Sequence, residues 1–218
     1  MIPTDRRARL AGARLYFVTD AATEESVLRA ALEGGADMLQ LRDPTLTDDE
    51  LLAAAGAYRS LCDEHGALMW LNDRPDLAVR AGADGVHLGQ EDMPVGAARA
   101  LVGNELLIGV STHSPDQLDA AIAAGADQVS VGPVWETPTK PGRAATGLDY
   151  VRHAARGKPP VPWFAIGGIS ARNVDEVVAA GATRAVVVRA LRDAPDPRSA
   201  AAELRAALAG RSTVGAAQ

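Results

Sequence analysis

The chain has 218 residues, 47% of them apolar, which is enough for one sizeable hydrophobic core. Its net charge of −6 argues against a general nucleic-acid binder, so we do not expect nucleic acid as a partner. No apolar run approaches the length of a membrane span, so we do not expect the chain to enter a membrane. Cys62 is the only cysteine, which excludes a disulfide framework and leads us to expect a cytoplasmic protein.

In chain order, residues 1–12 are basic but lack an apolar targeting segment, and we expect them to form an N-terminal extension. Residues 13–210 are expected to form one catalytic domain, and residues 211–218 a flexible tail. Within the domain, short apolar runs predict eight parallel strands that are buried on both faces. The predicted strands are Leu15–Thr19, Met38–Leu41, Leu68–Leu71, Gly85–Leu88, Leu106–Gly109, Gln128–Val131, Trp163–Ile166 and Ala185–Val188.

Helical segments separate these runs, and three of them carry recognisable start signals. Thr47 with Glu50 predicts a capping box, and Ser114 with Gln117 predicts a second one. Ser170 is expected to be the N-cap of a later helix. The segment from 135 to 147 follows the predicted sixth strand without any such pattern, and we interpret it as an active-site loop.

A repeat links the helices to the strands that follow them. Four times a small residue and a glycine end a helical stretch and run directly into an apolar strand, within residues 34–41, 81–88, 124–131 and 180–188. The first three copies contain Gly-Ala-Asp, ending at Asp37, Asp84 and Asp127, and the fourth has Thr183 instead. Glycine adopts the left-handed conformation at low cost after a helix. The repeat predicts an α/β fold, a single-domain (β/α)8 TIM barrel with its chemistry at the carboxyl ends of the strands.

Asp73 and Asp92 follow neighbouring predicted strands and are candidate metal ligands. Mg²⁺ is usually held by one or two carboxylates together with substrate phosphates, and this pair fits that pattern. Taken singly, each aspartate is better explained as a helix cap or a surface ion pair, and it is their matching positions after neighbouring strands that favour the metal.

Arg42, Lys140 and Arg189 also follow predicted strands and are candidate phosphate ligands, the alternative being solvated loop charges. The double glycine Gly167-Gly168 follows the seventh predicted strand, where barrels commonly bind phosphate through backbone N–H groups, although a tight turn would also need glycine.

The sequence contains little that points to acid–base or nucleotide chemistry. His113 is a candidate general base by residue type, but no Ser-His-Asp order accompanies it, and His87 lies within a strand, where a structural role is favoured. No zinc spacing, GxGxxG or P-loop pattern is present, so neither a dinucleotide nor an ATP site is indicated.

The motifs at the strand ends, taken together, resemble those of the thiamine-phosphate synthase (thiamine phosphate pyrophosphorylase) family, from about Leu15 to Leu208. The matching segments are Gln40-Leu41-Arg42-Asp43, Asn72-Asp73-Arg74, Val86-His87-Leu88-Gly89-Gln90-Glu91-Asp92, Gly109-Val110-Ser111-Thr112-His113, Gly132-Pro133-Val134-Trp135-Glu136-Thr137-Pro138-Thr139-Lys140 and Ile166-Gly167-Gly168-Ile169.

The resemblance implies a transferase that joins hydroxymethylpyrimidine diphosphate to thiazole phosphate, giving thiamine phosphate and pyrophosphate by dissociative loss of pyrophosphate. It implies that Gln40, Arg42, Asn72, Ser111 and Lys140 hold the pyrimidine diphosphate, with Arg42, Ser111 and Lys140 as catalytic residues. It implies that Asp73 and Asp92 hold Mg²⁺, and that Thr137, Thr139, Gly168, Val188 and Arg189 surround the thiazole phosphate. The implied partners are these two small molecules, with a homo-oligomer left open.

Two positions depart from the family pattern. The family usually has a lysine where this chain has Pro44, and it often has a small residue at position 189. A thiazole tautomerase, a related barrel, would have a histidine in place of Pro133, which favours the synthase. A phosphosugar isomerase or epimerase would need a clear acid–base pair. A non-catalytic thiazole-phosphate binder is supported only by Pro44.

Overall fold

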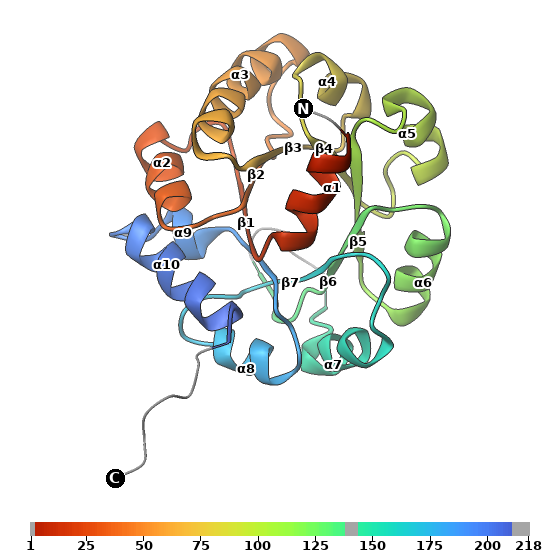
Figure 1. Ribbon diagram of the computed structural model, residues 1–218, viewed down its shortest axis with the longest axis vertical. Helices are drawn as coiled ribbons and strands as arrows, with labels where there is room; N and C mark the ends of the chain where they lie inside the picture. The colour runs from red at the N-terminus through yellow and green to blue at the C-terminus, as the bar shows by residue number, and fades with distance from the viewer. Residues whose placement is uncertain (1–2, 138–143, 211–218) are drawn as a thin grey trace.

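The computed structural model describes residues 3–137 and 144–210, and within them eight short apolar segments form strands. They are β1 (Leu15–Thr19), β2 (Met38–Leu41), β3 (Leu68–Asn72), β4 (Gly85–Leu88), β5 (Leu107–Thr112), β6 (Gln128–Val131), β7 (Trp163–Ile166) and β8 (Ala185–Val187). Each strand pairs in parallel with the next, and β8 pairs with β1, which closes the barrel (Figure 1). The predicted (β/α)8 fold is therefore confirmed.

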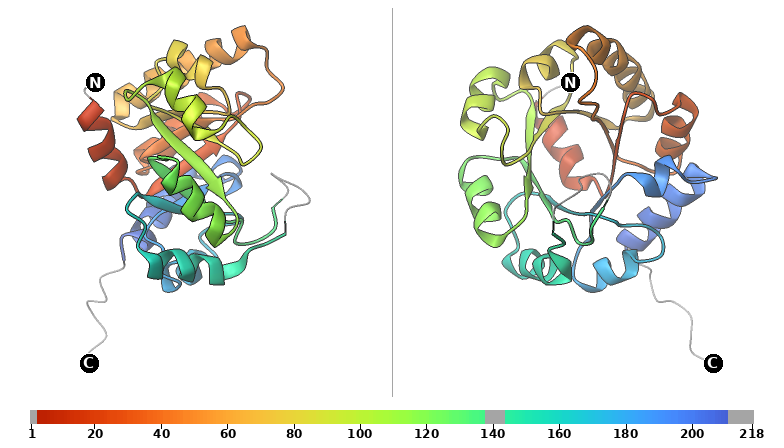
Figure 2. Two further views of the ribbon diagram at one scale, coloured as in Figure 1. Left: turned by 90° about the vertical axis from the view of Figure 1, so that its right-hand side faces the viewer. Right: turned by 180° about the vertical axis from the view of Figure 1, so that it is seen from behind.

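Helices surround this barrel on its outside, and one further helix lies across one of its ends (Figures 1 and 2). That end helix is α1 (Pro3–Gly12). The outer helices are α2 (Glu25–Glu33), α3 (Asp48–His65), α4 (Pro75–Arg80), α5 (Val95–Val102), α6 (Pro115–Ala123), α7 (Gly147–Gly157), α8 (Val174–Ala179), α9 (Arg189–Arg192) and α10 (Pro197–Leu208). None of the described helices combines the length and the apolar character that a bilayer crossing requires.

Two apolar cores result from the alternation of side chains along each strand. Residues such as Leu39 and Met69 point outward and pack against the helices in the larger core. Their neighbours Met38 and Trp70 point inward and form a smaller core inside the barrel, which Leu10 of α1 also joins. The N-terminal end of the barrel is therefore filled with side chains, and a substrate site belongs at the opposite end.

Glycines on two neighbouring strands make room for Trp70, the largest side chain inside the barrel. A Cβ at Gly85 would lie 2.8 Å from the indole ring, and a Cβ at Gly109 would lie 2.4 Å from the Gln128 side-chain oxygen and 3.0 Å from the indole. No side chain fits at such separations, so these strand glycines follow from close packing inside the barrel.

The aspartates of the Gly-Ala-Asp repeat, which we call the basal aspartates (Asp37, Asp84 and Asp127), connect neighbouring strands at the N-terminal end of the barrel. The carboxylate of Asp84 accepts from the backbone N–H of Met69 at 2.9 Å, and that of Asp127 accepts from Ile108 at 2.9 Å. Each basal aspartate also pairs with arginine: Arg205 at Asp37, Arg6 and Arg59 at Asp84, and Arg7 and Arg99 at Asp127. The repeat thus holds strand ends together through buried or half-buried charge pairs.

The fourth copy of the repeat lacks an aspartate, and at the junction of β1 and β8 arginine side chains connect the neighbouring segments instead. Arg184 donates to the carbonyls of Ala13 at 3.0 Å and Ala11 at 2.8 Å. Arg14 donates in the opposite direction, to Thr183 at 3.4 Å and to Leu208 of α10 at 3.0 Å. The segment after α1 and the end of α10 are therefore both held at one junction.

Three local predictions need correction. β5 runs to Thr112 rather than ending at Gly109, because Thr112 Oγ1 donates to the Ser130 carbonyl at 2.9 Å and so fits inside the sheet. At α6, Ser114 accepts from Gln117 as expected, but the Gln117 side chain accepts from the N–H of His113, so the box is incomplete. The N-cap of α8 is not Ser170.

The remaining helix signals agree with the structure. The capping box of Thr47 and Glu50 at α3 is complete. In α3, burial raises the pKa of the Cys62 thiol to about 12, so this lone cysteine is an inert core residue.

Candidate active site

A cavity of about 650 Å³ opens at the carboxyl ends of the strands. The predicted substrate-binding residues that line it are Gln40, Arg42, Asn72, Ser111, Thr137, Gly168, Val188 and Arg189. Thr139 and Lys140 lie outside the described residues. These lining residues lie in β2, β3 and β5 and in the segments after β2, β6, β7 and β8, so closure of the barrel brings them together.

The inner part of the cavity offers hydrogen bonds rather than charges. The side-chain amide of Gln40 donates to the Tyr16 hydroxyl, and both side chains line the cavity. Burial raises the pKa of Tyr16 well above its usual value, and the hydrogen bond from Gln40 opposes this only in part. The phenol therefore stays protonated at neutral pH and is a hydrogen-bonding group rather than a base.

Ser111 is held from two sides at the end of β5. Its hydroxyl lies 3.0 Å from Nε2 of His87, which comes from the adjacent strand β4. Its carbonyl accepts from the side chain of Gln90 at 2.6 Å. Ser111 is 8% exposed, so its hydroxyl is almost fully enclosed by protein where it meets the cavity. This fixed orientation suits recognition of a polar ring rather than nucleophilic attack.

Arg42 presents an uncompensated charge to the cavity. Its backbone N–H donates to the Thr19 carbonyl at 2.8 Å, which fixes the start of its loop. Its Nε is buried and has no hydrogen-bond partner among the described residues, and its guanidinium forms no ion pair with them. A buried donor without a partner is destabilising unless a ligand satisfies it, and a guanidinium matches phosphate oxygens.

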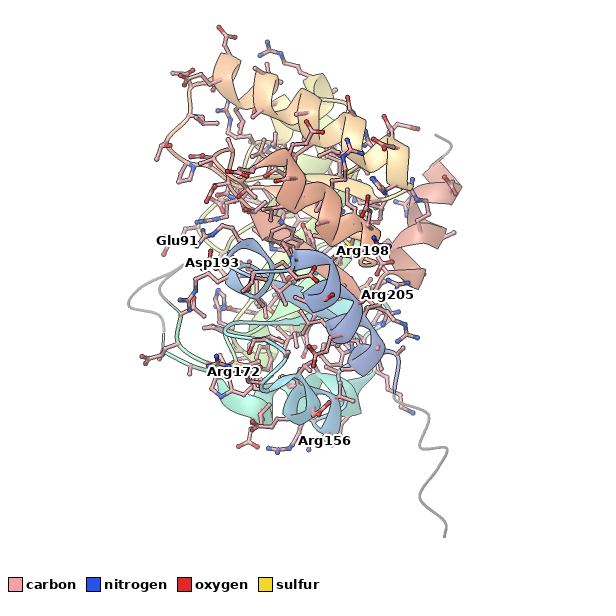
Figure 3. All side chains as sticks on the ribbon, turned by 90° about the vertical axis from the view of Figure 1, so that its left-hand side faces the viewer. Glu91, Arg156, Arg172, Asp193, Arg198 and Arg205 are labelled. Atoms are coloured by element: carbon pink, nitrogen blue, oxygen red, sulfur yellow. The ribbon has the colours of Figure 1, made fainter. Side chains whose placement is uncertain are left out.

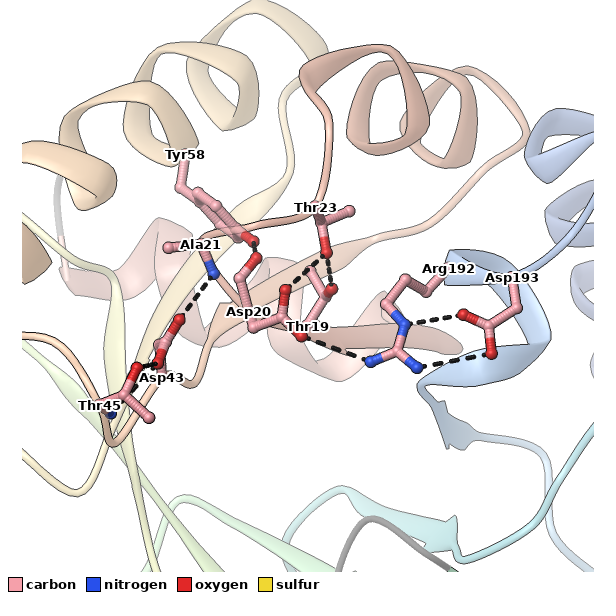
Figure 4. A network of polar contacts seen from close by, with 9 residues as sticks. All are labelled: Thr19, Asp20, Ala21, Thr23, Asp43, Thr45, Tyr58, Arg192 and Asp193. Carbon is pink, nitrogen blue, oxygen red and sulfur yellow. Dashed lines mark hydrogen bonds and ion pairs between the residues drawn. The ribbon is translucent and has the colours of Figure 1, made fainter.

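Polar contacts join the loops around Arg42 (Figure 4). The Asp43 carboxylate accepts from Thr45 Oγ1 at 2.6 Å and from the Ala21 N–H at 3.3 Å, and the hydrogen bonds with Thr45 lower the pKa of Asp43. On the other side of Ala21, Asp20 pairs with Arg192 of α9 at 3.3 Å. The loops after β1, β2 and β8 are thus held together at the cavity mouth.

Asp193 is the acidic residue of this mouth, and it is held by its neighbour. Arg192 donates through Nε to Oδ1 at 2.8 Å, and this contact lowers the pKa of Asp193, with Arg189 adding a weaker effect. Asp193 lines the cavity but keeps its charge matched within the protein. Asp193 therefore does not neutralise the arginines that line the cavity, and these can bind an anionic ligand.

The double glycine after β7 forms a turn that only glycine adopts without strain. Gly167 has φ of +107° and Gly168 of +70°, both in the left-handed region. A Cβ on Gly168 would lie 3.1 Å from Cβ of Trp135. The Gly168 carbonyl accepts from the Asn173 side chain at 3.0 Å, which pins the loop between β7 and α8. The turn thus offers bare backbone to the cavity.

His113 lies on the same cavity. Its Nδ1 donates to the Gly132 carbonyl, which leaves Nε2 as the acceptor in the neutral ring. The backbone carbonyl of Gly132 thus helps to orient the ring.

Asp73 and Asp92 do not line the cavity but stand beside it, after β3 and β4. Asp73 has φ of +59°, an unusual backbone for a residue other than glycine, and its N–H donates to the His87 carbonyl at 2.8 Å. Its Oδ2 accepts from the side chain of Asn72, and Oδ2 of Asp92 accepts from Gly89 at 2.6 Å. The described residues contain no group of three or more His, Cys, Asp or Glu side chains placed to hold a metal ion.

The cavity also includes residues that the sequence did not single out. These are Tyr16, Ser130, Arg172 and Asp193. Tyr16 and Ser130 lie inside strands, where only the sheet register tells which side chains face inward. Pro44, in contrast, is exposed and does not line the cavity.

Comparison with known proteins gives one consistent result. Residues 15–191 match the family model described as thiamine monophosphate synthase. The chain is 51% identical over 208 residues to the thiamine-phosphate synthase of Acidothermus cellulolyticus, covering 93% of this chain and 98% of that protein. It is 53% identical over 204 residues to that of Thermobifida fusca, covering 91% and 94%. A solved thiamine phosphate pyrophosphorylase from Pyrococcus furiosus superimposes with a TM-score of 0.82 and 35% identity, covering 93% and 96%.

Proposed function

Because this chain belongs to the thiamine monophosphate synthase family, it is a transferase that makes thiamine phosphate, and we propose how its residues divide the two substrates between them. The reaction joins hydroxymethylpyrimidine diphosphate to thiazole phosphate and releases pyrophosphate. The observation that carries the proposal is a single cavity with two kinds of lining: neutral hydrogen-bonding groups inside, and arginines with bare glycine backbone at the mouth.

The pyrimidine diphosphate belongs at β2, β3 and β5. Gln40 and Ser111 hold the uncharged ring, since both are buried and fixed by neighbours. Asn72 and the guanidinium of Arg42, which has no ion-pair partner in the part of the chain that the structure describes, receive the diphosphate, with Lys140 as a further cation. The thiazole phosphate belongs at β7 and β8, beside Gly168, Val188 and Arg189, with Thr137 and Thr139.

The carboxylates of Asp73 and Asp92 fit Mg²⁺, which is held by few protein ligands and completes its shell with water and phosphate oxygens. Each carboxylate accepts a hydrogen bond at its Oδ2, which orients it. The positive φ of Asp73 costs conformational energy, and residues in such conformations cluster at functional sites. When bound, the ion would supply charge neutralisation for the diphosphate.

The residues of the cavity support loss of pyrophosphate without a base. The C–O bond to the diphosphate breaks, the electron pair leaves with pyrophosphate, and Arg42 stabilises the negative charge that develops there. The thiazole nitrogen then supplies its lone pair to the pyrimidine methylene cation. No proton is taken from either substrate in these steps, which agrees with a protonated Tyr16.

The assay that tests this function uses purified protein, both substrates and Mg²⁺, with thiamine phosphate and pyrophosphate measured in equal amounts. Formation of both products in a one-to-one ratio is expected. Binding of thiazole phosphate without any turnover would instead identify a non-catalytic binder, and isomerisation of the thiazole alone would identify a tautomerase.

Gly168→Ala is expected to raise the KM for thiazole phosphate about tenfold and to leave the KM for pyrimidine diphosphate unchanged. The added methyl group would lie 3.1 Å from Cβ of Trp135, so the turn that offers its backbone to the phosphate has to shift. A tenfold change corresponds to one lost charge-assisted hydrogen bond. The control is Gly66→Ala, since Gly66 has nearly the same φ, +67° against +70°, but no atom within 4 Å of the added carbon. Both variants carry similar backbone strain, so equal KM changes in the two would contradict the assignment.

We propose a cytoplasmic location and assembly into a homo-oligomer. The first is supported by one cysteine that is buried and inert. Size-exclusion chromatography with light scattering would determine the second.

A further inference from the structure

Arg172 is a cation on the cavity wall to which the reaction described above assigns no role. It lines the same cavity as Gly168 and Arg189, and its exposed side chain forms no ion pair with any described residue. Some arginines away from the cavity are paired, as Arg59 and Arg99 are with basal aspartates at 2.8 and 2.5 Å, whereas others, such as Arg156, form no ion pair with a described residue. What distinguishes Arg172 is therefore its place on the cavity wall, where a ligand can reach its charge.

The loop that carries Arg172 is folded onto the glycine turn. The N–H of Arg172 donates to Ser170 Oγ at 3.4 Å, and the N–H of Ser170 donates to the Asn173 side chain at 2.9 Å. Asn173 in turn donates to the carbonyl of Gly168 at 3.0 Å. Arg172 is thus tied through three hydrogen bonds to the turn assigned to the thiazole phosphate, and Figure 3 shows it at the same end of the molecule as Asp193.

Among the described residues, the cavity lining carries more positive than negative side chains. Asp193 is the acidic residue of the cavity lining, and it is already paired with Arg192 at 2.8 Å. Arg172 and Arg189 are therefore both available to an anion. A phosphate monoester carries close to two negative charges at neutral pH, so one guanidinium would leave it half compensated.

We propose that Arg172 is a specificity-determining residue that binds the phosphate of the thiazole substrate opposite Arg189 and selects the phosphorylated thiazole over the free alcohol. This rests on the proposed assignment of the thiazole phosphate to β7 and β8. Arg172 touches the phosphate and not the reacting atoms, so its contribution is to binding and leaves the chemical step unchanged.

The test compares Arg172→Ala, Arg172→Lys and the control Arg156→Ala, an exposed arginine of α7 that does not line the cavity. We expect Arg172→Ala to raise the KM for thiazole phosphate about tenfold, with kcat and the KM for pyrimidine diphosphate unchanged. The unphosphorylated thiazole alcohol, used as a competitive inhibitor, should bind wild type and variant equally. Arg172→Lys should recover part of the loss, and Arg156→Ala should match wild type.

The outcomes separate this inference from the proposed function. An Arg172→Ala variant with an unchanged KM for thiazole phosphate, or with equal weakening of the phosphorylated and unphosphorylated thiazoles, would overturn the role of Arg172 while wild-type turnover stands. A wild-type protein that neither binds nor consumes thiazole phosphate would overturn the proposed function, and this inference with it.

Discussion

Asp84→Ala is expected to lower the free energy of unfolding by about 3–5 kcal/mol, because it leaves buried charge without a partner. Asp84 is 1% exposed, and its carboxylate pairs with Arg6 at 2.9 Å and with Arg59 at 2.8 Å. It also accepts from the backbone N–H of Met69. The substitution therefore removes the one carboxylate that accepts from Arg6, from Arg59 and from the backbone of β3. Urea unfolding followed by circular dichroism would measure the loss.

The matched control is Asp149→Ala on the surface of α7. Asp149 pairs with Arg152 at 2.7 Å, as short a contact as those of Asp84, but its side chain is 95% exposed. Solvent screens such a pair, so we expect a change within about 0.5 kcal/mol. A loss below about 1 kcal/mol for Asp84→Ala would show that the basal aspartates do not hold the barrel. At temperatures where Asp84→Ala remains folded, turnover should be unchanged, since Asp84 lies at the end opposite the cavity.

Asp73→Asn and Asp92→Asn are each expected to reduce kcat at least about tenfold, which corresponds to roughly 1.4 kcal/mol of transition-state stabilisation. Both remove a formal charge from the proposed Mg²⁺ site while keeping side-chain size. Asparagine also tolerates the left-handed backbone of position 73, where φ is +59°. The double variant should lose less than the product of the two single effects, because both changes disable one ion.

Three measurements make this result specific to the metal. Apparent affinity for Mg²⁺, titrated in the presence of pyrimidine diphosphate, should fall in both variants. Asp76→Asn, which removes an exposed charge paired with Arg74 in the first turn of α4, should keep turnover within about twofold of wild type. Full wild-type activity in a chelator, or strictly multiplicative losses, would contradict a shared ion.

Most strands could be predicted because burial on both faces leaves an uninterrupted apolar run. β5 was the exception, since Ser111 and Thr112 resemble the start of a loop. Their hydroxyls are satisfied inside the sheet, by His87 and by the Ser130 carbonyl, and a partner on another strand is invisible in the sequence. Ser170 was misjudged for a local reason: its N–H donates to the side chain of Asn173 three residues later, and α8 begins after Asn173 rather than after Ser170.

Residues of the candidate site could be predicted where the order of strands in the barrel is enough to place them. Gln40, Arg42 and Asn72 stand at strand ends or directly after them, and a parallel barrel brings such positions to one face. Tyr16 and Arg172 were not predictable, since one depends on which face of β1 is inward and the other on how a loop folds back onto Gly168. The positive φ of Asp73 is likewise a tertiary property.

The junction of β1 and β8 constrains how the chain can fold as it leaves the ribosome. The partners of Arg14, Thr183 and Leu208, lie 169 and 194 residues further along the chain. At ordinary translation speeds that interval takes roughly 10 to 40 s. Throughout it, the exposed edge of β1 has no permanent neighbour on its β8 side. The nascent barrel is thus an open, curling sheet until its last strand emerges, and this edge is the one that a chaperone would have to shield.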